Sequence, residues 1–100
     1  MRVEYTQRFT EDLSDIAAYY AATDQPMTGV RLADRIQDVV ARIARTPESG
    51  RPVSERPGVR VVTLRPYRYK VFYSYAASGE TIRILHIRHM SRRTWTAGPL

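Results

Sequence analysis

Hydrophobic residues in the first half of the chain recur with the spacing of two amphipathic helices. Between Gln7 and Ala22 the apolar positions form one stripe, which consists of Phe9, Leu13, Ile16, Ala17 and Tyr20. A second stripe follows the helix-breaking sequence Asp24-Gln25-Pro26 and consists of Leu32, Ala33, Ile36, Val39, Val40 and Ile43. Apolar residues that repeat every three to four positions are typical of helices with one buried face. Thr6 is a candidate cap for the first helix. The short link predicts that the two helices form an antiparallel hairpin.

The second half of the chain has the pattern of β-strands, rich in β-branched and aromatic residues. The expected strands are Val59–Leu64, Tyr67–Tyr75 and Thr81–His89, with a short first strand at Val3–Tyr5 near the N-terminus. Turn residues separate them at Arg65-Pro66 and Ser78-Gly79, whereas residues 50–58, with two prolines and two glycines, predict a loop. The predicted order is β-α-α-β-β-β, an α+β fold in which an antiparallel sheet packs against a helical hairpin. A length of 100 residues predicts one domain, 1–100.

Tyrosines mark one face of the second long strand. Tyr67, Tyr69, Tyr73 and Tyr75 share this face with Val71. Each buried tyrosine needs a partner for its hydroxyl, so this face is unusual for a plain apolar core. The other face carries Arg68, Lys70, Phe72 and Ser74. Because it is mostly polar, it is the candidate open face of the sheet, with Lys70 near its centre.

Positive charge is concentrated in the second half of the chain. Residues 1–50 carry six Arg and eight Asp or Glu, whereas residues 51–100 carry nine Arg, one Lys and two Glu. This asymmetry favours nucleic acid, the ribosome or an acidic protein as a partner. The alternative is a solubilising surface in a protein that uses Arg in place of Lys, because Lys70 is the only lysine.

Other sequence features exclude several classes of protein. The chain has no cysteine, which excludes disulfides and thiolate zinc sites. It has no apolar run of about 20 residues and no apolar signal region, so we expect a cytoplasmic protein without a membrane segment. A Gly-rich phosphate loop, a serine nucleophile elbow and a close pair of carboxylates are all missing from the sequence.

The two histidines lie in or next to the last strand. His86 shares its alternation with Ile82 and Ile84, which predicts a hydrogen-bonded histidine in the core. His89 ends the strand, where it can act as a general acid or base or remain a solvated polar residue. Because they are three residues apart, the two rings are expected on opposite faces, so we expect no metal site.

The tail after the last strand combines cations with the only tryptophan. Arg92 and Arg93 can bind phosphate oxygens in a bidentate manner, or they can serve solubility alone. Trp95 can stack on a base or cover the edge of the sheet. This cluster follows directly from a rigid strand, which is a common location for functional residues.

Several short motifs, taken together, resemble the RelE/ParE superfamily, the toxins of type II toxin–antitoxin modules. The matching pieces are Phe9-x-x-x-Leu13-x-x-Ile16-x-x-Tyr19, then Thr46-Pro47 with Gly50, Leu64-x-x-Tyr67-Arg68-Tyr69-Lys70-Val71-Phe72-Tyr73, Ile84-Leu85-His86-Ile87-Arg88-His89 and Arg92-Arg93-x-Trp95. Each piece is weak alone, and their common order and spacing make the resemblance specific. It implies a toxin that is neutralised by a small antitoxin encoded beside it, and we expect no cofactor.

The resemblance implies two alternative activities. RelE-like members cleave messenger RNA in the ribosomal A site, whereas ParE-like members inhibit DNA gyrase and are not nucleases. RelE-like nucleases usually carry lysines on the strand that corresponds to Val59–Leu64 and a tyrosine near the C-terminus. This chain has Arg60, Val61, Val62 and Thr63 on that strand and Trp95 in the tail. The ending His89-x-x-Arg92-Arg93 is similar to the ParE or plasmid-stabilisation branch, so gyrase inhibition is favoured. Ribosome-dependent cleavage by an endoribonuclease and a non-catalytic nucleic-acid-binding module are the alternatives.

Three sets of candidate site residues follow. For contact with the target, gyrase or the ribosome, the set is Arg60, Arg65, Arg68, His89, Arg92, Arg93 and Trp95. A ribonuclease would use Lys70, His89, Arg92 and Arg93 for proton transfer and for stabilising the phosphate charge. The antitoxin is expected to cover apolar positions of the helices, namely Leu13, Ala17, Tyr20 and Ile36. Whether the protein is an enzyme depends on which of the two activities it has.

Overall fold

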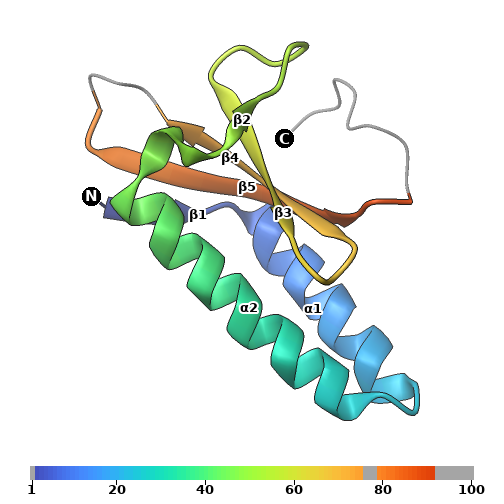
Figure 1. Cartoon of the computed structure of the whole chain (residues 1–100). Coiled ribbons are helices and arrows are strands. Elements are labelled where there is room, and N and C mark those ends of the chain that lie inside the picture. Colours follow the sequence, from blue (N-terminus) through green and yellow to red (C-terminus); the bar gives the residue numbers. More distant parts are fainter. Residues whose placement is uncertain (1, 76–78, 92–100) are drawn as a thin grey trace.

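A helical hairpin packs on one face of a five-stranded sheet (Figure 1), in a computed structural model that describes residues 2–75 and 79–91. The helices are α1 (Gln7–Ala22) and α2 (Pro26–Arg45), and a short 3₁₀ helix, η1 (Pro47–Ser49), follows α2. The strands are β1 (Arg2–Tyr5), β2 (Arg51–Pro52), β3 (Val59–Leu64), β4 (Tyr69–Tyr75) and β5 (Thr81–His89). The predicted α+β fold is therefore confirmed. Neither described helix combines the length and the apolar character that crossing a membrane requires.

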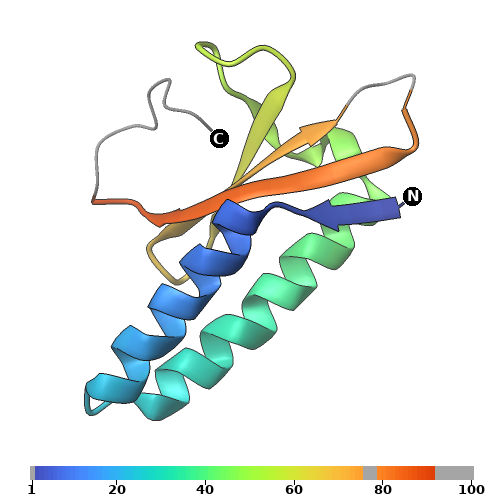
Figure 2. The ribbon, with the colours of Figure 1, turned by 180° about the vertical axis from the view of Figure 1, so that it is seen from behind.

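The sheet is mixed, with the strand order β1-β5-β4-β3-β2. Strands β3, β4 and β5 form the predicted antiparallel meander. Strand β1 runs parallel to β5 along its outer edge, as Figure 2 shows from behind. Parallel neighbours need a long connection, and the helices and the meander together provide it. The prediction of a loop over residues 50–58 is wrong at Arg51 and Pro52, because the chain leaving η1 pairs with the edge of β3.

The N-terminus of α1 is fixed to β5 by the predicted cap. The hydroxyl oxygen of Thr6 accepts a hydrogen bond from the backbone N–H of Phe9, with 3.1 Å between oxygen and nitrogen. The same hydroxyl donates to the carbonyl of Leu85 at 2.8 Å. One side chain thus satisfies an unpaired donor of the first helical turn and an acceptor on β5 just beyond the end of β1.

The main core lies between the hairpin and the sheet. Its buried members from the helices are Phe9, Leu32, Ile36, Val39 and Ile43, and those from the strands are Val62, Leu64, Tyr69, Val71, Tyr73, Ile82, Ile84 and Ile87. The predicted helical stripes are confirmed, except that Ala17 and Ala33 are exposed. On the tyrosine face Tyr69 and Tyr73 are buried, whereas Tyr75 is half-buried. The predicted start of this strand at Tyr67 is wrong, because the chain still turns there and β4 begins at Tyr69.

A second, smaller apolar cluster covers part of the opposite face. It consists of Val59, Val61, Phe72 and Leu85, with half-buried Val53 packed against it. The expectation that Phe72 belongs to an open polar face is therefore wrong. The segment that joins β2 to β3 supplies Val53, a residue that strand alternation alone does not bring to this face.

A buried tyrosine holds η1 against the sheet. The Tyr73 hydroxyl donates to the carbonyl of Pro47 at 2.6 Å and accepts from the backbone N–H of Gly50 at 2.9 Å. Arg60 reinforces this turn, because its guanidinium donates to the carbonyls of Glu48 at 3.2 Å and Gly50 at 2.8 Å. These contacts explain the structural role of the Thr46-Pro47 and Gly50 motif, because Tyr73 binds the backbone of Pro47 and Gly50.

Candidate functional site

Cations gather where β5 ends beside the turn between β3 and β4. The backbone N–H of Met90, just after β5, donates to the carbonyl of Arg68 in that turn at 2.7 Å. We call this region the basic end of the sheet, and it comprises Arg65, Arg68, Lys70, Arg88 and His89. Arg65 and Arg68 are exposed, and the other three side chains are half-buried. The structure thus brings together five basic side chains from two separate segments of the chain, residues 65–70 and 88–89.

The basic end has two faces, because neighbouring residues of a strand point in opposite directions. Lys70 of β4 lies directly across from Arg88 of β5, and Tyr69 lies across from His89. Tyr69 belongs to the core beneath the helices, and the His89 ring meets the Tyr69 ring edge-on, with centroids 5.2 Å apart. His89 is therefore on the helix side of the sheet, whereas Lys70 and Arg88 are on the opposite side.

His89 is held by the residue two positions further along the chain. The backbone N–H of Ser91 donates to Nδ1 of His89 at 3.1 Å. The Ser91 hydroxyl oxygen lies 2.7 Å from the same nitrogen. Together with the Tyr69 ring, these contacts fix the orientation of a half-buried imidazole at the end of β5.

Of the remaining residues of the predicted target-binding set, only Arg60 is described, and it does not belong to this cluster. Arg60 lies near the other end of β3, where its guanidinium binds the carbonyls of η1. Arg92, Arg93 and Trp95 lie outside the described residues. Conversely, Arg88 is absent from the predicted set, and the observed register of β4 and β5 places it across from Lys70.

The residues expected to meet an antitoxin differ in exposure. Leu13 and Tyr20 are half-buried at the edge of the core, and Ala17 is exposed. Ile36 is buried between α2 and the sheet, so it offers no surface. Three larger apolar side chains, Tyr19, Met27 and Val30, are 60%, 56% and 53% exposed on either side of the turn that joins the helices.

His86 is buried and hydrogen-bonded as predicted, but the predicted face is wrong. A β-bulge shifts the register so that Tyr73 pairs with Ile84 and Phe72 pairs with His86. Leu85 is the extra residue, and it moves His86 to the face away from the helices. There the imidazole stacks on the Phe72 ring, with centroids 5.8 Å apart.

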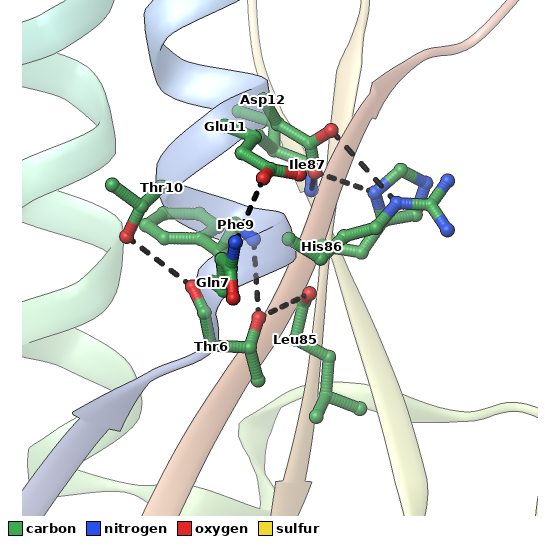
Figure 3. A network of polar contacts seen from close by, with 10 residues as sticks. Thr6, Gln7, Phe9, Thr10, Glu11, Asp12, Leu85, His86 and Ile87 are labelled. Carbon is green, nitrogen blue, oxygen red and sulfur yellow. Dashed lines mark hydrogen bonds and ion pairs between the residues drawn. The ribbon is translucent and has the colours of Figure 1, made fainter. Parts of the chain in front are cut away.

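Asp12 of α1 contacts His86, as Figure 3 shows. One carboxylate oxygen lies 2.6 Å from Nδ1 of His86 and also accepts from the backbone N–H of Ile87 at 3.1 Å. Asp12 thus binds β5 where β1 no longer covers its edge. Because 74 residues separate Asp12 from His86, no local pattern could have predicted the pair.

The described part of the chain contains no group of three His, Cys, Asp or Glu side chains that could hold a metal ion. The basic end offers guanidinium, ammonium and imidazole groups, which suit oxygen acceptors with negative charge.

Comparisons with known proteins find a matching family profile and solved structures with a similar fold. The sequence profile described as the ParE toxin of the type II toxin-antitoxin system parDE matches residues 3–94. A chain of the chromosomal ParDE TA system from P. aeruginosa is 26% identical, with a TM-score of 0.74, and the match covers 89% of this chain and 95% of that one. The YoeB/ParE toxin from Agrobacterium tumefaciens is 19% identical, with a TM-score of 0.63 and coverages of 89% and 98%. The isolated E. coli RelE toxin is 10% identical, with a TM-score of 0.63 and coverages of 92% and 86%. A search of curated proteins finds no match.

Proposed function

The chain belongs to the ParE family of toxins from type II toxin–antitoxin systems, and from this membership we propose that it inhibits DNA gyrase and is neutralised by a cognate antitoxin. The observation that carries the proposal is the family match over residues 3–94, nearly the whole chain. Gyrase is the target that the ParE branch implies, and RelE-like cleavage of messenger RNA is the alternative.

The arrangement of the basic end supports a toxin without nuclease activity. Cleaving RNA needs a proton acceptor and a charge-stabilising cation near the same phosphate, each within hydrogen-bond reach of its atom. Of the four predicted ribonuclease residues, Lys70 and His89 are described, and they lie on opposite faces of the sheet. The imidazole on the same face as Lys70 is His86, which is 5% exposed and engaged with Asp12.

The proposal predicts a clear difference between two assays. The purified toxin should inhibit supercoiling by gyrase, and induction of the toxin in cells should give no ribosome-dependent cuts when transcripts are mapped by primer extension. The control is the toxin mixed with its antitoxin, which should leave supercoiling intact. Cuts at A-site codons together with undisturbed supercoiling would reverse the assignment.

We propose that the antitoxin covers the apolar surface of the helical hairpin. Leu13 and Tyr20 are only partly covered, Ala17 is exposed, and Tyr19, Met27 and Val30 surround the turn between the helices. Exposed apolar side chains that cluster in this way are typical of surfaces that bind another protein. An amphipathic segment that folds on this surface would bury apolar area around the turn between the helices.

Antitoxin binding is expected to raise the thermal stability of the toxin. At an antitoxin concentration of about 1,000 times the dissociation constant, linkage contributes roughly 4 kcal/mol to the free energy of unfolding. A thermal melt at fixed toxin concentration measures this effect. Val30→Arg should weaken antitoxin binding and reduce the shift, whereas Ser54→Arg, at an exposed position after β2, should not. An unchanged melt in the presence of the antitoxin would count against the proposed interaction.

A further inference from the structure

The hydrogen bonds around His89 determine which ring nitrogen carries the proton. A backbone N–H can only donate, so the nitrogen that receives it must offer a lone pair. In His89 this nitrogen is Nδ1, which lies 3.1 Å from the backbone nitrogen of Ser91. A neutral imidazole has one proton, and that proton must therefore be on Nε2.

Two further contacts keep the ring in this orientation. The Ser91 hydroxyl lies 2.7 Å from Nδ1 and can donate to the same lone pair. The ring of Tyr69, a core residue, stands at 85° to the imidazole on the neighbouring strand. Rotating the imidazole to exchange its nitrogens would break both contacts with Ser91.

We propose that His89 contacts the target as a fixed hydrogen-bond donor through Nε2–H and does not act as a general base. This inference rests on the proposed function, because it concerns the contact with the inhibited target. A general base at Nε2 would need a lone pair on that nitrogen, which the Ser91 contact denies to the neutral ring. A donor at Nε2 instead suits an oxygen acceptor.

The surroundings of His89 favour an acceptor oxygen with negative charge. Arg65 and Arg68 are exposed in the turn against which the end of β5 lies, as the bond between Met90 and Arg68 shows. Hydrogen bonds from a donor to an ionised oxygen are stronger than bonds between neutral groups. The ligand is therefore a carboxylate of the target protein or a phosphate of its DNA, both of which offer the same chemistry.

Substitutions at position 89 distinguish a donor from a base. The amide nitrogen of Gln reaches the place of Nε2, whereas the amide nitrogen of Asn reaches only the place of Nδ1. His89→Gln should therefore keep gyrase inhibition within about threefold, whereas His89→Ala and His89→Asn should each lose about tenfold or more, the effect of one hydrogen bond to a charged group. Equal loss in His89→Gln and His89→Ala would overturn the proposal.

The ring itself provides a test that does not depend on activity. Nitrogen NMR of the labelled full chain should show a proton on Nε2 and none on Nδ1 in neutral His89. Ser91→Ala should give the same result, because it keeps the backbone N–H. A proton on Nδ1 would overturn the proposal even if the toxin inhibits gyrase. If the proton is on Nε2 but the toxin does not inhibit gyrase, only the proposed target is overturned.

The source of the oxygen follows from binding experiments with two probes. Loss of affinity in His89→Ala for gyrase without DNA would assign the acceptor to a carboxylate of the protein. Loss of affinity for bare duplex DNA would assign it to a phosphate. Equal affinities of wild type and His89→Ala for both probes and for the gyrase–DNA complex would remove His89 from the contact.

Discussion

Gly50→Ala is expected to destabilise the protein by about 3 kcal/mol, the upper end of the cost of overpacking a buried site. A Cβ at this position would lie 2.5 Å from the Tyr73 hydroxyl and 2.7 Å from a carbon of its ring. The ring cannot move away easily, because Tyr73 is fully buried and its hydroxyl binds both Pro47 and Gly50. For a domain of this length, the melting temperature should fall by about 12 to 24 °C.

Two further variants show whether the close approach to Tyr73 is the cause. Tyr73→Phe alone should cost about 2 kcal/mol, because it leaves the carbonyl of Pro47 and the N–H of Gly50 without their partner. Combining it with Gly50→Ala should cost less than the sum of the two, since the clash with the hydroxyl disappears. Gly58→Ala is the matched control: nothing lies within 4 Å of its Cβ, and its positive φ of 83° alone should cost about 1–2 kcal/mol. If Gly50→Ala and Gly58→Ala lower the melting temperature by the same amount, the clash with Tyr73 is not the cause.

Arg65→Ala combined with Arg68→Ala is expected to reduce toxin potency by about 30-fold or more, as for an interface hot spot worth roughly 2 kcal/mol. Both side chains are exposed in the turn beside the end of β5. Truncating exposed cations changes the free energy of unfolding little, so the variant should fold normally. The measurements are the toxin concentration that halves gyrase supercoiling and a thermal melt of the same sample.

A variant with the same change in net charge separates the basic end from general electrostatics. Arg42→Ala combined with Arg45→Ala removes two exposed cations from the last turn of α2, beyond Arg35, whose guanidinium contacts the carbonyl of Arg65. This control should inhibit gyrase as well as the wild type does in the absence of antitoxin. If both double variants lose potency equally, total charge and not the basic end is responsible. Full potency in the variant without Arg65 and Arg68 would direct attention to Lys70 and Arg88.

The sequence by itself determined most of the secondary structure. The predicted bounds of α1, β3 and β5 agree with the structure, because each element has a complete hydrophobic period and a clear turn or cap at its ends. The exposed face of α1 and the tyrosine face of β4 follow from the same periodicity. The family was also recognisable, since the motif residues are themselves core and turn positions, as Tyr73 and Gly50 demonstrate.

Only the tertiary structure decided how these elements meet. A single extra residue, Leu85, reverses the face of His86, and alternation counted along the strand cannot detect such a bulge. The parallel place of β1 and the contact of Asp12 with β5 depend on segments more than 70 residues apart. The tautomer of His89 depends on a backbone N–H whose direction is set by the path of the chain after β5. Periodicity along the sequence indicates which side of an element is apolar. Register, bulges and side-chain partners instead come from packing between distant segments. These three features determine the chemistry of the basic end.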